Sequence, residues 1–248
     1  AGNWIILSLE GVNNIISNSC GVTGSSFIAS GPDGWVSIGP SGSGFICATA
    51  PDNTVYGGLC RGRNSVDWQV KRGAAYHIAQ GNYSVLGGGE SNQSAEDHTV
   101  VCGGERNSVI QAHSAIVGGR YNRIGAQYSF IGGGQSNLVS GAHSSILGGK
   151  RNIMLGSYSM IGGGWLNSGA GNRNTICAGY YNFVKGTDNI IGGGYRNTIS
   201  GAYQVIVGGR SNQLLAGRTA SFIGAGTNNV ITRSIAGIVS GSGNYISN

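Results

Sequence analysis

Apolar and polar positions recur along most of this chain with a period of fifteen residues. Counted from an asparagine, an aliphatic residue stands six positions before, a glycine three positions before, and in most repeats another apolar residue two positions after. Only the step from Asn212 to Asn229 departs from this period, by two extra residues. The asparagines are Asn92, Asn107, Asn122, Asn137, Asn152, Asn167, Asn182, Asn197, Asn212, Asn229 and Asn244.

A fifteen-residue unit is too short for a helix pair or a propeller blade, but it suits one coil of a β-solenoid. Alternate residues of a strand face the same side. Each asparagine and the apolar residue after it should therefore point inward on one side of the coil, and pairs such as Ser129 and Ile131 on the other. The sequence predicts an all-β fold, a parallel β-solenoid or β-roll of about eleven 15-residue coils over residues 84–248. Stacked asparagines should form a hydrogen-bonded ladder.

Residues 1–83 keep only fragments of this pattern and contain Trp4, Trp35, Trp68 and all three prolines of the chain. Exposed solenoid ends need covering. We expect this region to be either an irregular cap on the rod or a distal head that meets a receptor, and the sequence leaves both open. Because the chain begins at Ala1 and stops in mid-repeat, we also expect it to be a processed or trimmed piece.

The outward positions on the serine–isoleucine side carry a second pattern. Five positions before asparagine, glycine alternates with larger residues, and a large residue two positions earlier tends to accompany the glycine. A stripe of this kind is unusual on a water-exposed surface. It predicts burial against copies of the chain, most simply as a homotrimer, with another chain or the N-terminal region as the alternative cover. On this interpretation, Gly132→Val disturbs assembly more than coil folding. The predicted oligomer interface comprises Phe130, Gly132, Leu147, Met160, Gly162, Cys177, Ile190, Gly192, Val205 and Val207.

Composition narrows the functional classes. The 48 glycines lack the every-third period of collagen, and the net charge of +6 is too modest to indicate nucleic-acid binding by itself. No apolar run approaches the roughly 20 residues of a membrane helix. The sequence has no Ser-His-Asp set, nucleophile elbow or phosphate loop, and its five cysteines lack zinc spacing. We therefore expect a non-enzymatic protein without cofactor, metal site, nucleic-acid partner or membrane insertion.

Two corner columns carry candidate binding chemistry. One holds tyrosines and histidines, including His98 and His113; stacking explains it more simply than a metal site, because no third ligand is evident. The opposite corner combines aromatic rings, which stack on sugars, with basic groups, which bind carboxylates or phosphates. The need for soluble residues at any exposed corner is the competing explanation. The candidate glycan-binding residues are Arg120, Tyr121, Lys150, Arg151, Trp165, Tyr180, Tyr181, Tyr195, Arg196 and Arg210.

Units such as NLVSGAHSSILGGKRN (137–152) and NTISGAYQVIVGGRSN (197–212) resemble the head repeats of trimeric autotransporter adhesins, the YadA-like left-handed β-rolls, and repeats of phage and large-virus fibres. The resemblance covers about residues 84–248. It implies a trimeric module, extracellular or on a virion surface, that attaches to a cell-surface glycan or receptor. A purely structural shaft or capsid-decorating protein is the alternative. The units also resemble the coils of a ryegrass antifreeze protein, which implies ice binding, but the outward positions of the asparagine side are too ragged for a flat ice-binding array.

Overall fold

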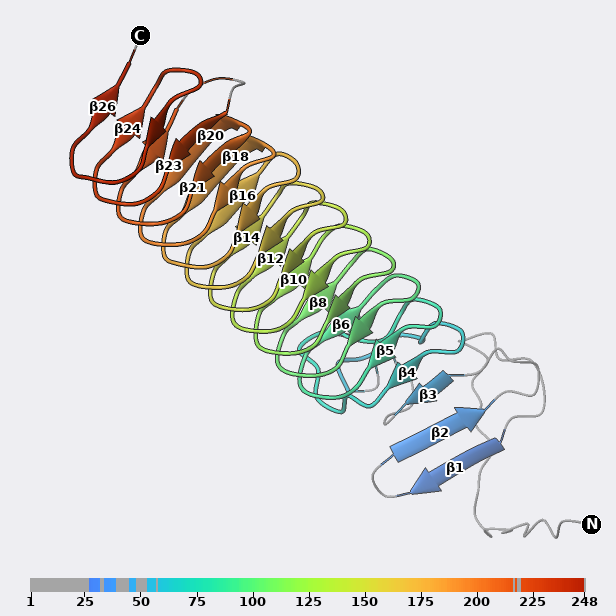
Figure 1. Ribbon diagram of the computed structural model, residues 1–248. Coiled ribbons are helices and arrows are strands. Elements are labelled where there is room, and N and C mark those ends of the chain that lie inside the picture. The colour runs from blue at the N-terminus through green and yellow to red at the C-terminus, as the bar shows by residue number, and fades with distance from the viewer. Residues whose placement is uncertain are drawn as a thin grey trace, which may run out of the picture.

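The computed structural model describes residues 27–31, 34–38, 45–47, 53–56, 58–215, 217 and 220–247. These residues form an elongated rod, in which the chain winds through successive coils from N-terminal strands at one end to the C-terminus at the other (Figure 1). Two sheets run along the rod, and successive coils add one short strand to each. The predicted all-β solenoid of parallel, stacked coils of about 15 residues is therefore confirmed.

Sheet 1 has fifteen strands and is formed by the serine–isoleucine side of the coils. The first three strands pair antiparallel, and pairing is parallel from β3 onward. Equivalent residues are in register, since Ile131 pairs with both Ile116 and Ile146. The strands are β1 (Phe27–Gly31), β2 (Gly34–Ile38), β3 (Phe45–Cys47), β4 (Val66–Asp67), β5 (Val85–Leu86), β7 (Val100–Val101), β9 (Ala115–Ile116), β11 (Phe130–Ile131), β13 (Ser145–Ile146), β15 (Met160–Ile161), β17 (Thr175–Ile176), β19 (Ile190–Ile191), β21 (Gln204–Ile206), β23 (Ser221–Ile223) and β25 (Gly237–Ile238).

Sheet 2 has eleven strands, all parallel, and is formed by the asparagine side. Gln213 pairs with Val230 across the irregular step, so the two extra residues leave the register intact. The strands are β6 (Gln93–Ser94), β8 (Ser108–Val109), β10 (Arg123–Ile124), β12 (Leu138–Val139), β14 (Ile153–Met154), β16 (Ser168–Ala170), β18 (Phe183–Thr187), β20 (Thr198–Ala202), β22 (Gln213–Leu214), β24 (Val230–Ile231) and β26 (Tyr245–Ile246).

Parallel pairing begins before residue 84, where the sequence period places the first coil. Val66 pairs with Val85, and Lys71 bridges to Glu90, so a longer coil precedes the regular ones. The antiparallel strands β1 to β3 extend the same sheet beyond this coil. In the described ranges, the N-terminal region therefore continues sheet 1. Trp4 and the prolines lie outside the described residues.

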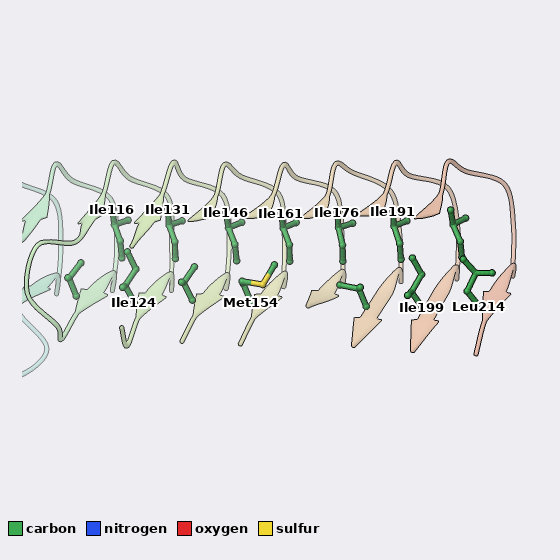
Figure 2. Close-up of a cluster of buried hydrophobic side chains, with 14 of the residues drawn as sticks. Ile116, Ile124, Ile131, Ile146, Met154, Ile161, Ile176, Ile191, Ile199 and Leu214 are labelled. Carbon is green, nitrogen blue, oxygen red and sulfur yellow. The ribbon is translucent and has the colours of Figure 1, made fainter. Parts of the chain in front are cut away.

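The interior of the rod is built from apolar ladders. Figure 2 shows isoleucines of sheet 1, such as Ile131 and Ile146, facing residues of sheet 2, such as Ile124 and Met154. These side chains are fully buried, and each contributes about 1.5–3 kcal/mol relative to an exposed position. Since every rung stacks on equivalent rungs above and below, the fifteen-residue repeat of the sequence follows from the repeat of the coil.

The predicted asparagine ladder is confirmed, and each asparagine satisfies backbone groups at its own corner and at the same corner of the next coil. The side-chain oxygen of Asn152 accepts the backbone N–H of Asn167 at 3.0 Å. Its amide nitrogen donates to the carbonyl of Gly148 at 3.1 Å and to that of Gly164 at 2.9 Å. A second buried ladder runs along the other corner, where Ser144 accepts the backbone N–H of Ser159 at 3.0 Å. Buried polar side chains thus supply hydrogen-bond partners for backbone groups at the coil corners, where the chain leaves the sheets.

Both corners contain left-handed backbone at residues other than glycine, which the sequence did not indicate. Tyr121 has φ of 58° and Tyr128 has φ of 54°, and equivalent residues in other coils behave alike. Such residues donate their N–H to the preceding coil, as Tyr121 does to Glu105 at 2.9 Å. The neighbouring Arg120 instead donates to the following coil, to Gly134. The left-handed residue and the residue before it therefore link each coil to both neighbouring coils, and the left-handed conformation costs roughly 1–2 kcal/mol.

The apolar interior ends at an ion cluster in the first coil. Asp67 pairs with Leu86, so it stands at the inward position of sheet 1. Its carboxylate accepts hydrogen bonds from Arg61 at 2.9 Å and from Arg72 at 3.2 Å, and all three side chains are buried. Burial lowers the pKa of the Arg61 guanidinium, while the charge of Asp67 opposes that shift. The cluster closes the N-terminal end of the core with paired charges.

Candidate functional site

The ten candidate glycan-binding residues lie together along one corner of the rod. One column is joined coil to coil by parallel bridges and contains Arg120, Lys150, Trp165, Tyr180, Tyr195 and Arg210. The other four are the next residues along the chain, in the left-handed conformation, namely Tyr121, Arg151, Tyr181 and Arg196. We call these two columns the aromatic–basic corner. The structure thus brings together every residue of the predicted edge.

The central rings of the aromatic–basic corner stack on one another. Trp165 and Tyr180 have ring centroids 4.8 Å apart, and Tyr180 and Tyr195 are 5.2 Å apart. Cations cover the two ends of the stack, with Lys150 at 5.8 Å from the Trp165 ring and Arg210 at 5.5 Å from the Tyr195 ring. The ring faces are therefore occupied within the chain. What the corner offers to a ligand is ring edges, phenol hydroxyls and positive charge.

Tyr121 forms a second, smaller cluster in the same corner. Arg106 and Arg120 lie over its ring, at 5.3 and 5.2 Å. Arg106 also donates a hydrogen bond to the Tyr121 hydroxyl, and this bond raises the pKa of the guanidinium. The carboxylate of Glu105 lies 4.0 Å from a guanidinium nitrogen of Arg106 and 3.7 Å from one of Arg120. These contacts satisfy part of the charge locally, so this cluster is less available to an anionic ligand than its composition indicates.

The predicted oligomer interface lies on the outer face of sheet 1. Phe130, Leu147, Ile190 and Val207 are exposed large apolar side chains. Cys177 is also exposed, whereas Met160, Val205 and the three interface glycines are half-buried. We call this surface the apolar stripe. Its outward positions carry no charged residue from Val85 to Val239, whereas those of sheet 2 include Arg123 and Lys185.

The glycines of the apolar stripe have a cause within the chain. A Cβ on Gly132 would lie 2.4 Å from the carbonyl oxygen of Leu147 in the next coil. A Cβ on Gly162 would lie 2.2 Å from the carbonyl oxygen of Cys177, and one on Gly192 would lie 2.4 Å from that of Val207. The expectation that Gly132→Val disturbs assembly more than folding was therefore wrong, because the added side chain collides with the chain's own backbone. The alternation of glycine with larger residues is therefore explained within one chain. Only the exposed apolar residues indicate a neighbouring subunit.

The opposite corner is a ladder of stacked rings, as expected. Tyr83, His98, His113, Tyr128, His143 and Tyr158 stack in sequence. Their centroids are 4.8–5.1 Å apart, and their planes differ by at most 13°. Beyond them Arg173 donates two hydrogen bonds to Asp188, and these lower the pKa of that carboxyl. Within the described part of the chain, no group of three or more potential ligands is placed to hold a metal ion.

Comparison with known proteins adds no functional information. No protein-family model matches the chain, and no curated protein is significantly similar to it. In the described ranges, no helix has the length and apolarity needed to cross a membrane.

Proposed function

We propose that this chain is a module of a left-handed, homotrimeric fibre, extracellular or on a virion surface, that attaches to a cell-surface glycan or receptor and has no catalytic role. The observation that carries this proposal is the apolar stripe. Exposed apolar residues recur along eleven coils of sheet 1 without a single charge. Water-exposed apolar surfaces of this extent mark interaction sites.

A second and third copy of the chain fit the apolar stripe better than an unrelated partner. The stripe runs along the whole regular part of the rod, so only a partner of the same length and coil rise can cover all of it. A three-fold axis parallel to the rod places the same residue of each chain at the same height. Large and small outward residues then meet their equivalents at every coil.

Two further observations support a surface location and a binding role. Cys60 is disulfide-bonded, and disulfides persist mainly in oxidising compartments outside the cytosol. The aromatic–basic corner lies outside the apolar stripe and carries exposed arginines such as Arg151, Arg196 and Arg210. Arginine forks bind carboxylates and phosphates in a bidentate manner, so acidic glycans are the ligands that this corner fits best.

A purely structural shaft is the second candidate, because the ring faces of Trp165, Tyr180 and Tyr195 are already occupied by one another and by cations. On this alternative the corner stiffens the rod and binds nothing. A glycan array separates the two functions. The binding module predicts glycan signals that are lost in the Arg196→Gln/Arg210→Gln variant and retained in the Lys185→Gln/Arg233→Gln variant, which removes the same charge elsewhere. The shaft predicts no signal in any of the three.

Self-association is tested with a matched pair of leucines. Leu147 on sheet 1 is 53% exposed and Leu155 on sheet 2 is 52% exposed, so they differ mainly in the face that they occupy. We expect the wild type and Leu155→Glu to have the mass of a trimer in light scattering, and Leu147→Glu to dissociate. A monomeric wild type, or equal behaviour of the two variants, would refute the proposed interface.

A further inference from the structure

A polar pocket of about 320 Å³ lies on the outer face of sheet 2, near its N-terminal end. Gln93 and Arg123 line it from outward positions of strands β6 and β10. Ser91 and Arg106 line it from the adjoining corner. The segment with Tyr76 and His77, which belongs to the long first coil, closes one side. The pocket therefore exists only where the irregular coil meets the regular ones.

The charge of this pocket is positive. Its lining contains two guanidinium groups, from Arg106 and Arg123, and no carboxylate. Arg106 has partners in Tyr121 and Glu105. In the part of the chain that the structure describes, the Arg123 side chain makes neither a hydrogen bond nor an ion pair. The pKa of His77 is lowered chiefly by burial, and the nearby charges of Arg106 and Arg72 lower it further.

Neutral hydrogen-bonding groups accompany the two arginines. Ser91 is only 3% exposed, and its hydroxyl has no hydrogen-bond partner among the described residues. The side-chain oxygen of Gln93 accepts a hydrogen bond from Ser108 at 3.0 Å, while no described residue accepts from its amide nitrogen. A ligand with several oxygen atoms would find free hydrogen-bonding groups at Ser91 and Gln93.

We propose that this pocket binds a single sugar ring that carries a carboxylate or a sulfate. Arg123 binds the anionic group, and Arg106 adds a second positive charge. Ser91 and Gln93 hydrogen-bond to ring hydroxyls, and the half-exposed ring of Tyr76 packs against the sugar. The volume of about 320 Å³ lies at the lower end of the 300–1,000 Å³ range of ligand pockets, which suits a single sugar ring.

None of the ten residues of the aromatic–basic corner lines this pocket, although Arg106 contacts Tyr121 of that corner. The proposal does not depend on trimer formation, because the pocket lies on sheet 2. The probes are glucuronate and N-acetylglucosamine 6-sulfate, with glucose and inorganic sulfate as controls, measured by saturation-transfer NMR and by calorimetry on the full chain. We expect saturable binding of an acidic sugar and weaker binding of both controls. Arg123→Gln should weaken binding by roughly 10- to 100-fold, the usual loss for a hydrogen bond to a charged group.

Arg233→Gln is the matched control, since it removes an exposed arginine far along the rod from the pocket. It should leave binding unchanged, and thermal denaturation of both variants shows whether the fold is retained. Equal losses in the two variants would show that net charge, and not the pocket, attracts the ligand. Inorganic sulfate that binds as tightly as the acidic sugars would refute the assignment to a sugar. Absence of binding by both acidic sugars at millimolar concentration would overturn the proposal altogether.

Discussion

Three consecutive glycines, Gly162, Gly163 and Gly164, occupy three different environments, and alanine substitution should separate them. A Cβ on Gly163 meets nothing within 4 Å, and Ala178 stands at the equivalent position one coil later. A Cβ on Gly162 would lie 2.2 Å from the carbonyl oxygen of Cys177. Gly164 has φ of 89°, and its Cβ would lie 2.1 Å from the next coil's backbone and 2.6 Å from the amide of Asn167.

These distances predict a clear order of stability. Gly163→Ala should be neutral or should stabilise the rod by about 0.4–1 kcal/mol, because alanine restricts the unfolded chain more than glycine does. Gly162→Ala should destabilise it by about 1–3 kcal/mol through overpacking. Gly164→Ala should destabilise it by about 2–5 kcal/mol, because the left-handed conformation adds its own strain to the overpacking.

Urea denaturation of the three variants, followed by far-UV circular dichroism, measures this order. Since long repeat arrays depart from two-state unfolding, midpoints are compared directly, and hydrogen exchange of the coil that contains residues 157–171 gives the local effect. If Gly162→Ala is as stable as Gly163→Ala, the approach of the Cys177 carbonyl does not constrain this position. A Gly162→Ala rod that is stable but fails to assemble would restore an intermolecular role for the glycine.

Three other substitutions test the ladders and the cap. Asn152→Ala should lower stability by about 2–5 kcal/mol in the same urea assay, because it leaves the N–H of Asn167 and the carbonyl of Gly148 without their partner, each worth about 1–3 kcal/mol. The carbonyl of Gly164 still accepts the N–H of Lys150. An unchanged midpoint would refute the ladder. Asp67→Ala removes the buried carboxylate that both Arg61 and Arg72 bind and should destabilise the chain by about 3–5 kcal/mol in thermal denaturation, whereas a neutral result would contradict its role as a cap. Asp188→Asn removes a surface ion pair between partly exposed side chains, so the thermal midpoint should move little, and a large shift would show that the corner contact matters more than a surface ion pair usually does.

The interior of the rod was predictable because a ladder places each residue against its own equivalents. Asn137 hydrogen-bonds to Asn122 and Asn152, and Ile131 pairs with Ile116 and Ile146. A residue type that packs or hydrogen-bonds well at one coil therefore does so at the same position of every coil. The fifteen-residue period is visible in the sequence for this reason. The inward positions and the asparagine ladder followed from this repetition alone.

The corners were less predictable, because their backbone does not follow residue preferences. Tyr128 and Arg151 adopt a left-handed conformation that is uncommon for such residues, and no local signal distinguishes them. The sequence repeat also did not show why position 132 is a glycine, since the close approach to the carbonyl of Leu147 depends on how two coils pack in space.

The candidate sites were predictable in position and not in chemistry. The period places Trp165, Tyr180 and Tyr195 at the same corner, as observed. It does not show that the rings cover one another's faces. The pocket between Arg106 and Arg123 depends on the Tyr76 segment of the long first coil, whose length breaks the period. The sequence repeat could not predict this pocket, because the pocket forms where the repeat is interrupted.

The central proposal, a parallel homotrimer closed by the apolar stripe, is tested most directly with two cysteines already present. Cys102 and Cys177 are free, exposed and in the same column of sheet 1. A three-fold axis places each beside its own equivalents, so a short bismaleimide should join one pair of chains through Cys102 and another through Cys177. We expect covalent trimers from the wild type and at most covalent dimers from Cys102→Ser or Cys177→Ser. Failure to obtain any covalent trimer, or links that join Cys102 to Cys177, would contradict the proposed assembly.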